Sequence, residues 1–190
     1  MARTDNVYDL PKDLPVPQDD GACAHLPGLK LPPIALASTG GRSVDLSALE
    51  GRTVIYIYPR TGRPDQELPT GWNAIPGARG CTPQSCAFRD HFEELKRAGA
   101  AQVYGLSTQD SAYQREAVER LHLSFELLSD EKLQFAKELK LPTFQVDGMT
   151  LIKRLTLIAC DSVVERVFYP VFPPDRNASD VVAWLTAAKH

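Results

Sequence analysis

The sequence has no long apolar run, no strong excess of charge and few cysteines. No apolar run approaches the roughly 20 residues of a membrane-spanning helix. The first residues, Met-Ala-Arg-Thr-Asp-Asn-Val-Tyr, lack the apolar core of a secretory signal peptide. A net charge of −3 gives no reason to expect nucleic acid or an anionic membrane as a partner. We therefore expect a cytoplasmic protein without membrane or nucleic-acid contacts.

The sequence does contain four cysteines, and it has enough apolar residues to form one core. Apolar residues make up 43% of the 190 positions, which suits a single domain. In a reducing compartment, a pair of neighbouring cysteines is more often catalytic or metal-binding than structural.

Two of the cysteines lie five positions apart in Gly80-Cys81-Thr82-Pro83-Gln84-Ser85-Cys86, at the start of a helical pattern over residues 84–98. Proline is tolerated in a first turn, and Thr82 before it is the expected N-cap. Cys81 then lies at the mouth of the helix, where unpaired N–H groups and the helix dipole favour thiolate, the nucleophilic form. The pattern predicts a redox site.

The spacing of this pair has a structural consequence. Two positions five apart on a regular helix have Cα atoms roughly 8 to 9 Å apart, whereas a disulfide requires about 4.4–6.8 Å. A bond between Cys81 and Cys86 therefore requires the first helical turn to unwind.

The rest of the chain alternates between apolar strand patterns and amphipathic helix patterns. We expect a helix capped by Ser111, with Tyr113, Ala117 and Leu121 facing inward. The other expected elements are strands at 34–36, 43–46, 53–58, 102–107 and 125–128, a helix at 130–139, a β-rich stretch at 144–172 with turns at Asp147-Gly148 and Asp161-Ser162, and a last helix from about Asn177.

This order predicts an α/β fold in which helices flank a central mixed sheet. A reactive cysteine at a helix mouth just past a central strand indicates a thioredoxin-like arrangement. Residues 1–27, rich in proline, are the expected extended N-terminal arm, and residues 28–190 the domain itself.

At this point the sequence resembles the peroxiredoxins, specifically the bacterioferritin comigratory protein or peroxiredoxin Q branch. The resemblance runs from about residue 27 to the C-terminus. Its pieces are Ile55-Tyr56-Ile57-Tyr58-Pro59, the two-cysteine segment, Phe88-Arg89-Asp90, Leu127-Leu128-Ser129-Asp130 and Arg154-Leu155-Thr156-Leu157-Ile158.

The resemblance implies a thiol-dependent peroxidase acting on hydrogen peroxide and organic hydroperoxides. Cys81 would attack the peroxide, Arg154 would stabilise the thiolate and the departing oxygen, and Cys86 would resolve the sulfenic acid as a disulfide. A thioredoxin-type reductant would recycle the enzyme. The resemblance requires no metal, haem or flavin and leaves a monomer or a dimer open.

One departure from the family pattern is an insertion between the strand and the nucleophile. The family joins them by Pro-x-x-x-Thr-x-x-Cys, whereas here residues 60–79 intervene and Ala78 occupies the threonine position. Pro59 and Thr61 are the predicted substrate-binding residues, and Thr70 is the weaker alternative. We expect the insertion, with Trp72, to form a lid or a docking surface.

Alternatives remain open at this point. The protein could be a thiol–disulfide oxidoreductase, although the usual Cys-x-x-Cys is absent, or a redox-inert thioredoxin-like interaction module. A zinc site is chemically feasible, but the cysteine spacing fits it poorly; its ligands would come from Cys23, His25, Cys81, Cys86 and His91. Of the other cysteines, Cys23 is expected to be a free, exposed thiol and Cys160 an inert core residue.

Overall fold

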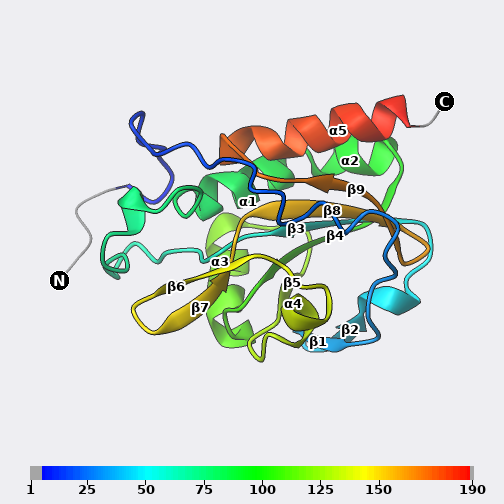
Figure 1. Cartoon of the computed structure of the whole chain (residues 1–190), viewed down its shortest axis with the longest axis horizontal. Helices are drawn as coiled ribbons and strands as arrows, with labels where there is room; N and C mark the ends of the chain where they lie inside the picture. Colours follow the sequence, from blue (N-terminus) through cyan, green and yellow to red (C-terminus); the bar gives the residue numbers. More distant parts are fainter. Residues whose placement is uncertain (1–5, 189–190) are drawn as a thin grey trace.

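A seven-stranded mixed sheet forms the centre of the computed structural model, which describes residues 6–188 (Figure 1). Its strand order is β2-β1-β5-β4-β3-β8-β9. The strands are β1 (Ala35–Ser38), β2 (Ser43–Asp45), β3 (Arg52–Ile57), β4 (Ala100–Ser107), β5 (Leu127–Ser129), β8 (Leu155–Cys160) and β9 (Val163–Phe168). A separate hairpin comprises β6 (Thr143–Val146) and β7 (Met149–Ile152).

In the described part of the chain, five α-helices accompany these strands. They are α1 (Cys81–Asp90), α2 (Phe92–Arg97), α3 (Ser111–Leu121), α4 (Gln134–Glu138) and α5 (Asn177–Ala187), with short 3-10 turns at Leu46–Ala48, Trp72–Ala74 and Pro174–Arg176. None of the helices within residues 6–188 combines the length and apolar character needed to cross a membrane.

Strand β3 is an interior strand of the sheet, between β4 and β8, and is buried on both faces. It runs parallel to β4 and antiparallel to β8. Val54 and Tyr56 pack on the side of α1, α2, α3 and α5, whereas Ile55 and Ile57 pack on the side of α4 and the N-terminal strands. The continuous apolar run follows from this burial of both faces. The predicted α/β fold with a mixed sheet is confirmed.

The cysteine helix begins three residues earlier than expected and is shorter. Gly80, not Thr82, is its N-cap, with φ of 101°, a left-handed conformation that favours glycine. A Cβ at Gly80 would overlap Pro174 and come within 2.7 Å of Leu10 Cδ2. The helix is interrupted at His91. The sequence predicts one helix over this stretch, whereas the structure has two, α1 and α2.

Two other helix boundaries also differ from expectation. The N-cap of α3 is Asp110 and not Ser111. The Asp110 carboxylate accepts the Tyr113 N–H at 2.7 Å, so the helix begins one residue after it, at Ser111. Tyr113 is only partly buried, and Gln114 lies on the buried face instead. The helix expected at 130–139 shrinks to α4, because the Asp130 carboxylate accepts the N–H groups of Phe135 and Ala136 ahead of it.

The predicted turns of the β-rich stretch are present. Asp147 and Gly148 join β6 to β7, and Asp161 and Ser162 join β8 to β9, all four with positive φ. In the arm, the expectation for Cys23 was wrong. Its side chain is buried in the core cluster that includes Ala159 of β8 and Val164 of β9, because residues 28–31 that follow it pair with the β8–β9 turn and the start of β9.

Candidate active site

Cys81 is the first residue of α1, and its side chain is only 3% exposed. Its thiol lies 3.6 Å from the Ala78 carbonyl oxygen, and Arg154 Nη2 donates to its sulfur at 3.2 Å. The helix N-terminus and a guanidinium thus converge on one sulfur atom. Both favour a negative charge there.

Arg154 lies between β7 and β8, and it is 3% exposed. Nε donates to the Gly77 carbonyl at 3.2 Å, and Nη2 donates to the carbonyls of Ala78 and Arg79 at 3.1 and 3.0 Å. These partners are neutral, so they fix the guanidinium without cancelling its charge. The segment that leads into Cys81 therefore also holds the cation that faces it.

A second set of buried polar groups fixes the other end of Arg154. Nη1 donates to Gln84 Oε1, and Gln84 Nε2 donates to Asn177 Oδ1 at 3.0 Å. The Thr156 hydroxyl donates to the same oxygen at 2.7 Å. Sequence reasoning missed Gln84 and Asn177. The position of Gln84, three residues after Cys81 and so on the same helix face, is the signal that could have found it.

Tyr56 of β3 and Tyr58 just after it close the site on the sheet side. Tyr56 stacks on Phe88 of α1 with ring centroids 4.3 Å apart, and its hydroxyl lies 3.1 Å from Ser85 Oγ. Burial raises the pKa of Tyr56 and of Tyr58, so both phenols stay protonated. The surroundings of Cys81 on this side are apolar and uncharged.

Cys86 lies on the same helix as Cys81 and is half-buried against the core. Burial raises the pKa of its thiol, although Arg89 acts in the opposite direction. Both thiols are free. Because α1 runs without interruption from Cys81 to Asp90, the sequence-based separation of roughly 8 to 9 Å between the two Cα atoms applies.

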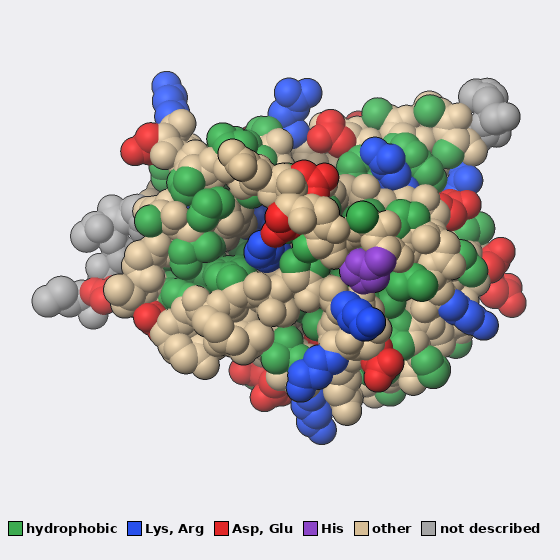
Figure 2. Space-filling view, viewed as in Figure 1, with side chains coloured by type: hydrophobic (Ala, Val, Ile, Leu, Met, Phe, Trp, Pro, Cys, Tyr) green, Lys and Arg blue, Asp and Glu red, His purple; other side chains and the backbone are tan. Residues whose placement is uncertain are grey.

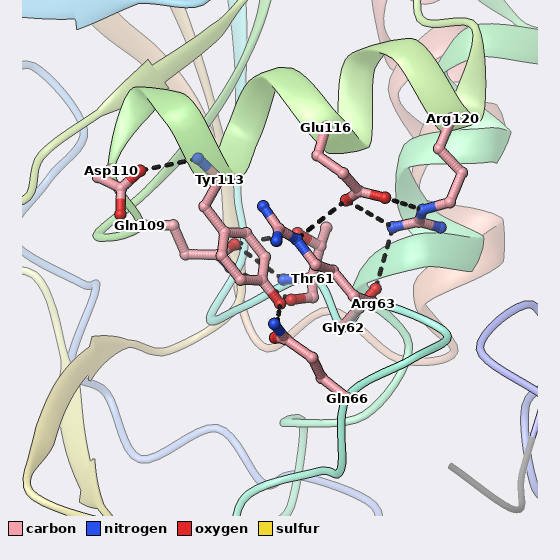
Figure 3. Close-up of polar contacts among 9 residues, drawn as sticks. All are labelled: Thr61, Gly62, Arg63, Gln66, Gln109, Asp110, Tyr113, Glu116 and Arg120. Atoms are coloured by element: carbon pink, nitrogen blue, oxygen red, sulfur yellow. Dashed lines mark hydrogen bonds and ion pairs between the residues drawn. The ribbon is translucent and has the colours of Figure 1, made fainter. Parts of the chain in front are cut away.

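Pro59 is buried two residues after the end of β3, and Thr61 is fully buried against Gln109. Figure 3 shows this contact: the Thr61 N–H and hydroxyl donate to Gln109 Oε1 at 2.9 and 3.1 Å, and Gln109 Nε2 donates to the Thr61 carbonyl at 3.2 Å. Thr70 is exposed. The binding role of Thr61 stays a prediction.

A small cavity of about 20 Å³ adjoins Cys81. Thr61 does not line this cavity. The residue with a hydroxyl group that does line it is Thr82. The lining residues are Val7, Arg60, Gly62, Leu68, Trp72, Arg79, Gly80, Cys81 and Thr82. The insertion and the arm thus both reach the nucleophile.

The insertion is anchored on α3 by a group of charged and aromatic side chains (Figure 3). The guanidinium carbons of Arg60 and Arg63 lie 4.8 and 4.3 Å from the centre of the Tyr113 ring. Arg120 donates to the Gly62 carbonyl at 3.0 Å and pairs with Glu116 at 2.6 Å. This arrangement fixes the start of the insertion, next to Cys81.

The middle of the insertion packs on the β6–β7 hairpin. Trp72 is buried against Phe144, Val146 and Leu151, with ring centroids of Trp72 and Phe144 6.2 Å apart. Thr70 N–H donates to the Asp147 carboxylate at 2.8 Å. The insertion therefore shares a small apolar core with this hairpin.

A larger cavity of about 240 Å³ opens on the face shown in Figure 2, where apolar side chains border a hollow. Arg154 and Gly77 line it, but Cys81 does not. Its other cation, Lys153, pairs with Asp20 at 2.8 Å, and hydrogen bonds from Lys153 and Tyr169 lower the pKa of Asp20 to about 2. The hollow is thus separate from the nucleophile.

The remaining cysteines lie apart from this site. Burial, together with the carboxylates of Asp20 and Asp19, raises the pKa of Cys23 to about 12. Cys160 ends β8 and is partly exposed, 3.8 Å from the Asp161 carboxylate, so that it is not the core residue expected. Among residues 6–188, no group of three or more His, Cys, Asp and Glu side chains is placed to hold a metal ion.

The chain is similar to known proteins over most of its length. The family model for Redoxin matches residues 26–185. Chloroplastic peroxiredoxin Q of Oryza sativa subsp. japonica is 32% identical over 159 residues, which cover 83% of this chain and 65% of the rice protein. The chain thus spans slightly less than two thirds of that relative. Chloroplastic peroxiredoxin Q of Sedum lineare is 31% identical, covering 83% of this chain and 76% of its own.

Among solved structures, the crystal structure of the peroxidoxin BcpB from Mycobacterium tuberculosis aligns with a TM-score of 0.67 and 25% identity. The alignment covers 85% of this chain and 96% of that one. The sheet and helices described above are therefore arranged as in that protein.

Proposed function

The chain belongs to the Redoxin family, and within it to the peroxiredoxins of the Q type, and from that premise we propose that it is a thiol-dependent peroxidase with Cys81 as its nucleophile. The observation that carries the proposal is the 3.2 Å contact of Arg154 Nη2 with Cys81 Sγ at the start of α1. A nucleophilic thiolate and a donor for the departing oxygen are what cleavage of an O–O bond needs.

In the first step the Cys81 thiolate attacks one peroxide oxygen in line with the O–O bond. The S–O bond forms as the O–O bond breaks, the sulfur is oxidised to a sulfenic acid, and the second oxygen leaves as water or an alcohol after taking a proton. Arg154 keeps its full positive charge beside the sulfur, because its other partners are neutral, so it can stabilise the negative charge that develops on the departing oxygen.

In the second step Cys86 resolves the intermediate. Its sulfur displaces the hydroxyl from Cys81, the S–S bond forms and one water leaves. Because its raised pKa keeps Cys86 a thiol, its proton is available to that water. The first turn of α1 has to open for the two sulfurs to meet.

In the third step an external dithiol reduces the disulfide by exchange, returning both cysteines to thiols and becoming a disulfide itself. We propose a thioredoxin-type reductant, as the family resemblance implies, and therefore a compartment that keeps thiols reduced, with the cytoplasm as our expectation. We also propose that the enzyme acts as a monomer or a dimer on hydrogen peroxide and organic hydroperoxides.

The test is a stopped-flow measurement of the reduced protein with hydrogen peroxide, followed by tryptophan fluorescence and by peroxide consumption. We expect rapid oxidation of the wild type and a loss of about a thousandfold or more in Cys81→Ser, because the attacking atom is gone. Cys160→Ser is the matched control and should keep the wild-type rate.

A slow reaction with peroxide combined with fast exchange against a disulfide substrate would instead favour a thiol–disulfide oxidoreductase. A protein inert in both assays would be an interaction module. Wild-type turnover by Cys81→Ser would remove Cys81 from the role of nucleophile.

A further inference from the structure

The cavity beside Cys81 has one wall that comes from the N-terminal arm. Val7 is 5% exposed and lines this cavity together with Trp72 and Leu68 of the insertion. The volume of about 20 Å³ is little more than the roughly 10–15 Å³ that one water molecule needs. A hydrogen peroxide molecule requires a small adjustment of these walls, whereas an alkyl group requires one of them to move.

The arm is bound to the segment that carries the nucleophile. Arg79, two residues before Cys81, donates through Nη2 to the carbonyl oxygens of Asn6 and Asp9 at 2.9 and 3.4 Å. The residue after Arg79 is Gly80, and Leu10 Cδ2 lies so close to it that position 80 has no space for a side chain. Residues 6–10 therefore contact both positions that precede the nucleophile.

The arm segment is also shaped by its own hydrogen bonds and by α3. Asn6 Oδ1 accepts the Tyr8 N–H at 3.0 Å, and Asn6 Nδ2 donates to the Asp9 carboxylate at 3.0 Å, which makes a local turn with Val7 at its inner side. Although burial acts to lower it, the pKa of Arg120 on α3 is raised by Glu116 and by the nearby Tyr8, so the arm segment lies close to this helix. Figure 1 shows the arm in dark blue on the same side of the molecule as the insertion.

We propose that residues 6–10 form a specificity-determining wall of the peroxide site, with Val7 favouring hydrogen peroxide and small hydroperoxides over bulky organic ones. The proposal rests on the proposed function, and it adds a second element to the wall formed by the insertion. It assigns the arm a role that the resemblance, which begins near residue 27, does not supply.

The kinetic test compares hydrogen peroxide with cumene hydroperoxide in the full-length reduced protein. Val7→Ala removes two carbon atoms from the wall, and a pocket that differs by one methylene changes selectivity by roughly 10- to 200-fold. We expect the ratio of the second-order rate constants, cumene hydroperoxide over hydrogen peroxide, to rise about tenfold. Val16→Ala, at a 62% exposed valine of the same arm, is the matched control and should keep the wild-type ratio.

A second measurement does not depend on peroxide chemistry. The reduced proteins are labelled with iodoacetamide or with the bulkier pyrene maleimide, and mass spectrometry of the Cys81 peptide gives each rate. We expect Val7→Ala to speed labelling of Cys81 by the maleimide more than by iodoacetamide. Arg79→Gln, which weakens the hold on the Asn6 and Asp9 carbonyls, should shift labelling in the same direction.

The outcomes separate the two proposals. If the wild type reduces both peroxides and neither the rate ratio nor the labelling ratio changes in Val7→Ala, the arm is not a wall and the peroxidase assignment stands. If the wild type reduces neither peroxide, the peroxidase assignment fails, and the labelling ratio alone decides whether the arm covers Cys81.

Discussion

At the scale of single residues, the site depends on how a buried cation is held in place. Arg154 is fixed by three backbone carbonyls and by Gln84, which in turn is fixed by Asn177. The guanidinium can therefore reach Cys81 without an acidic partner that would compete for it. Gln84 is thus a positioning residue for Arg154.

We predict that Gln84→Leu lowers the second-order rate constant with hydrogen peroxide by about 10- to 100-fold. The substitution keeps the volume but leaves Arg154 Nη1 without its acceptor, and an unsatisfied buried donor costs roughly 1–3 kcal/mol, where 1.36 kcal/mol corresponds to about tenfold in rate. Stopped-flow kinetics give the rate constant, and the pH dependence of Cys81 alkylation reports the thiolate directly.

Gln145→Leu, at an exposed position of β6, is the control for the loss of a glutamine. An unchanged rate constant together with an unchanged alkylation profile in Gln84→Leu would show that the carbonyls alone position Arg154. A changed melting temperature without either effect would make Gln84 a purely structural residue.

We predict that Cys86→Ser retains one rapid turnover but forms no Cys81–Cys86 disulfide. Without the resolving thiol, the sulfenic acid on Cys81 persists and is oxidised further to sulfinic acid. Mass spectrometry after peroxide treatment should show added oxygen on the Cys81 peptide. An intramolecular disulfide through Cys23 or Cys160 in this variant would assign the resolving role to another cysteine.

The site residues that the sequence predicts belong to short local patterns or to the family resemblance. Cys81 and Cys86 stand out because a cysteine pair at a helix start is typical of a redox site. Arg154 was identified through the family resemblance. Gln84 and Asn177 could not be paired from the sequence, because 93 positions separate them and their contact exists only in the folded protein. Cys23 was wrongly expected to be exposed, because its environment is set by the strand turn on which the arm lies.

At the scale of elements, the first turn of α1 has to be a helix in one state and open in another. Its N-cap is a glycine that offers no side-chain hydrogen bond, and Thr82 and Ser85 are poor helix formers. The first intrahelical bond runs from the Gln84 N–H to the Gly80 carbonyl at 3.0 Å. A turn with so few stabilising features opens at low cost.

We predict that oxidation to the Cys81–Cys86 disulfide speeds amide hydrogen exchange at Gln84–Phe88. A disulfide cannot span the roughly 8 to 9 Å between the two Cα atoms of a regular helix, so the bonds of this turn must break. Exchange measured by mass spectrometry in both redox states checks this, with α3 as an internal control whose protection should stay unchanged. Equal protection of α1 in both states, with the disulfide verified, would contradict the unwinding.

Element types were predictable from periodicity, whereas the exact ends were decided by individual polar contacts. The continuous apolar run of β3 and the turns at Asp147 and Asp161 follow from β-branched residues and turn residues. The helix starts do not, because the Asp110 and Asp130 carboxylates compete with neighbouring residues for the same N–H groups. Such competition depends on backbone geometry that a sequence pattern does not contain.

At the scale of the whole molecule, three segments distant in sequence enclose one sulfur atom. The insertion contributes Trp72 and Leu68, the arm contributes Val7, and the β6–β7 hairpin supports Trp72 from behind. Sequence reasoning placed the insertion near the site because it ends at Cys81. It could not place the hairpin behind it, because that contact depends on apolar faces meeting across some 70 residues of chain.

We predict that Trp72→Ala alters the rate constant with a bulky hydroperoxide more than that with hydrogen peroxide. Trp72 lines the cavity beside Cys81 and also fills the small core between the insertion and the hairpin, so its removal both widens the cavity and loosens the wall. Because Arg60 and Arg63 still hold the start of the insertion on Tyr113, the segment should stay attached to α3. Stopped-flow kinetics with cumene hydroperoxide and hydrogen peroxide measure the effect.

The other tryptophan supplies the matched control. Trp184 of α5 lies against Arg52, with the guanidinium carbon 5.7 Å from the ring centre, and it does not line the cavity beside Cys81. Trp184→Ala should therefore leave the ratio of the two rate constants unchanged, even if it lowers the melting temperature. If Trp72→Ala and a deletion of most of residues 60–79 both retain the wild-type rate constants, the insertion does not form part of the peroxide site. The wall beside Cys81 would then have to come from the arm alone.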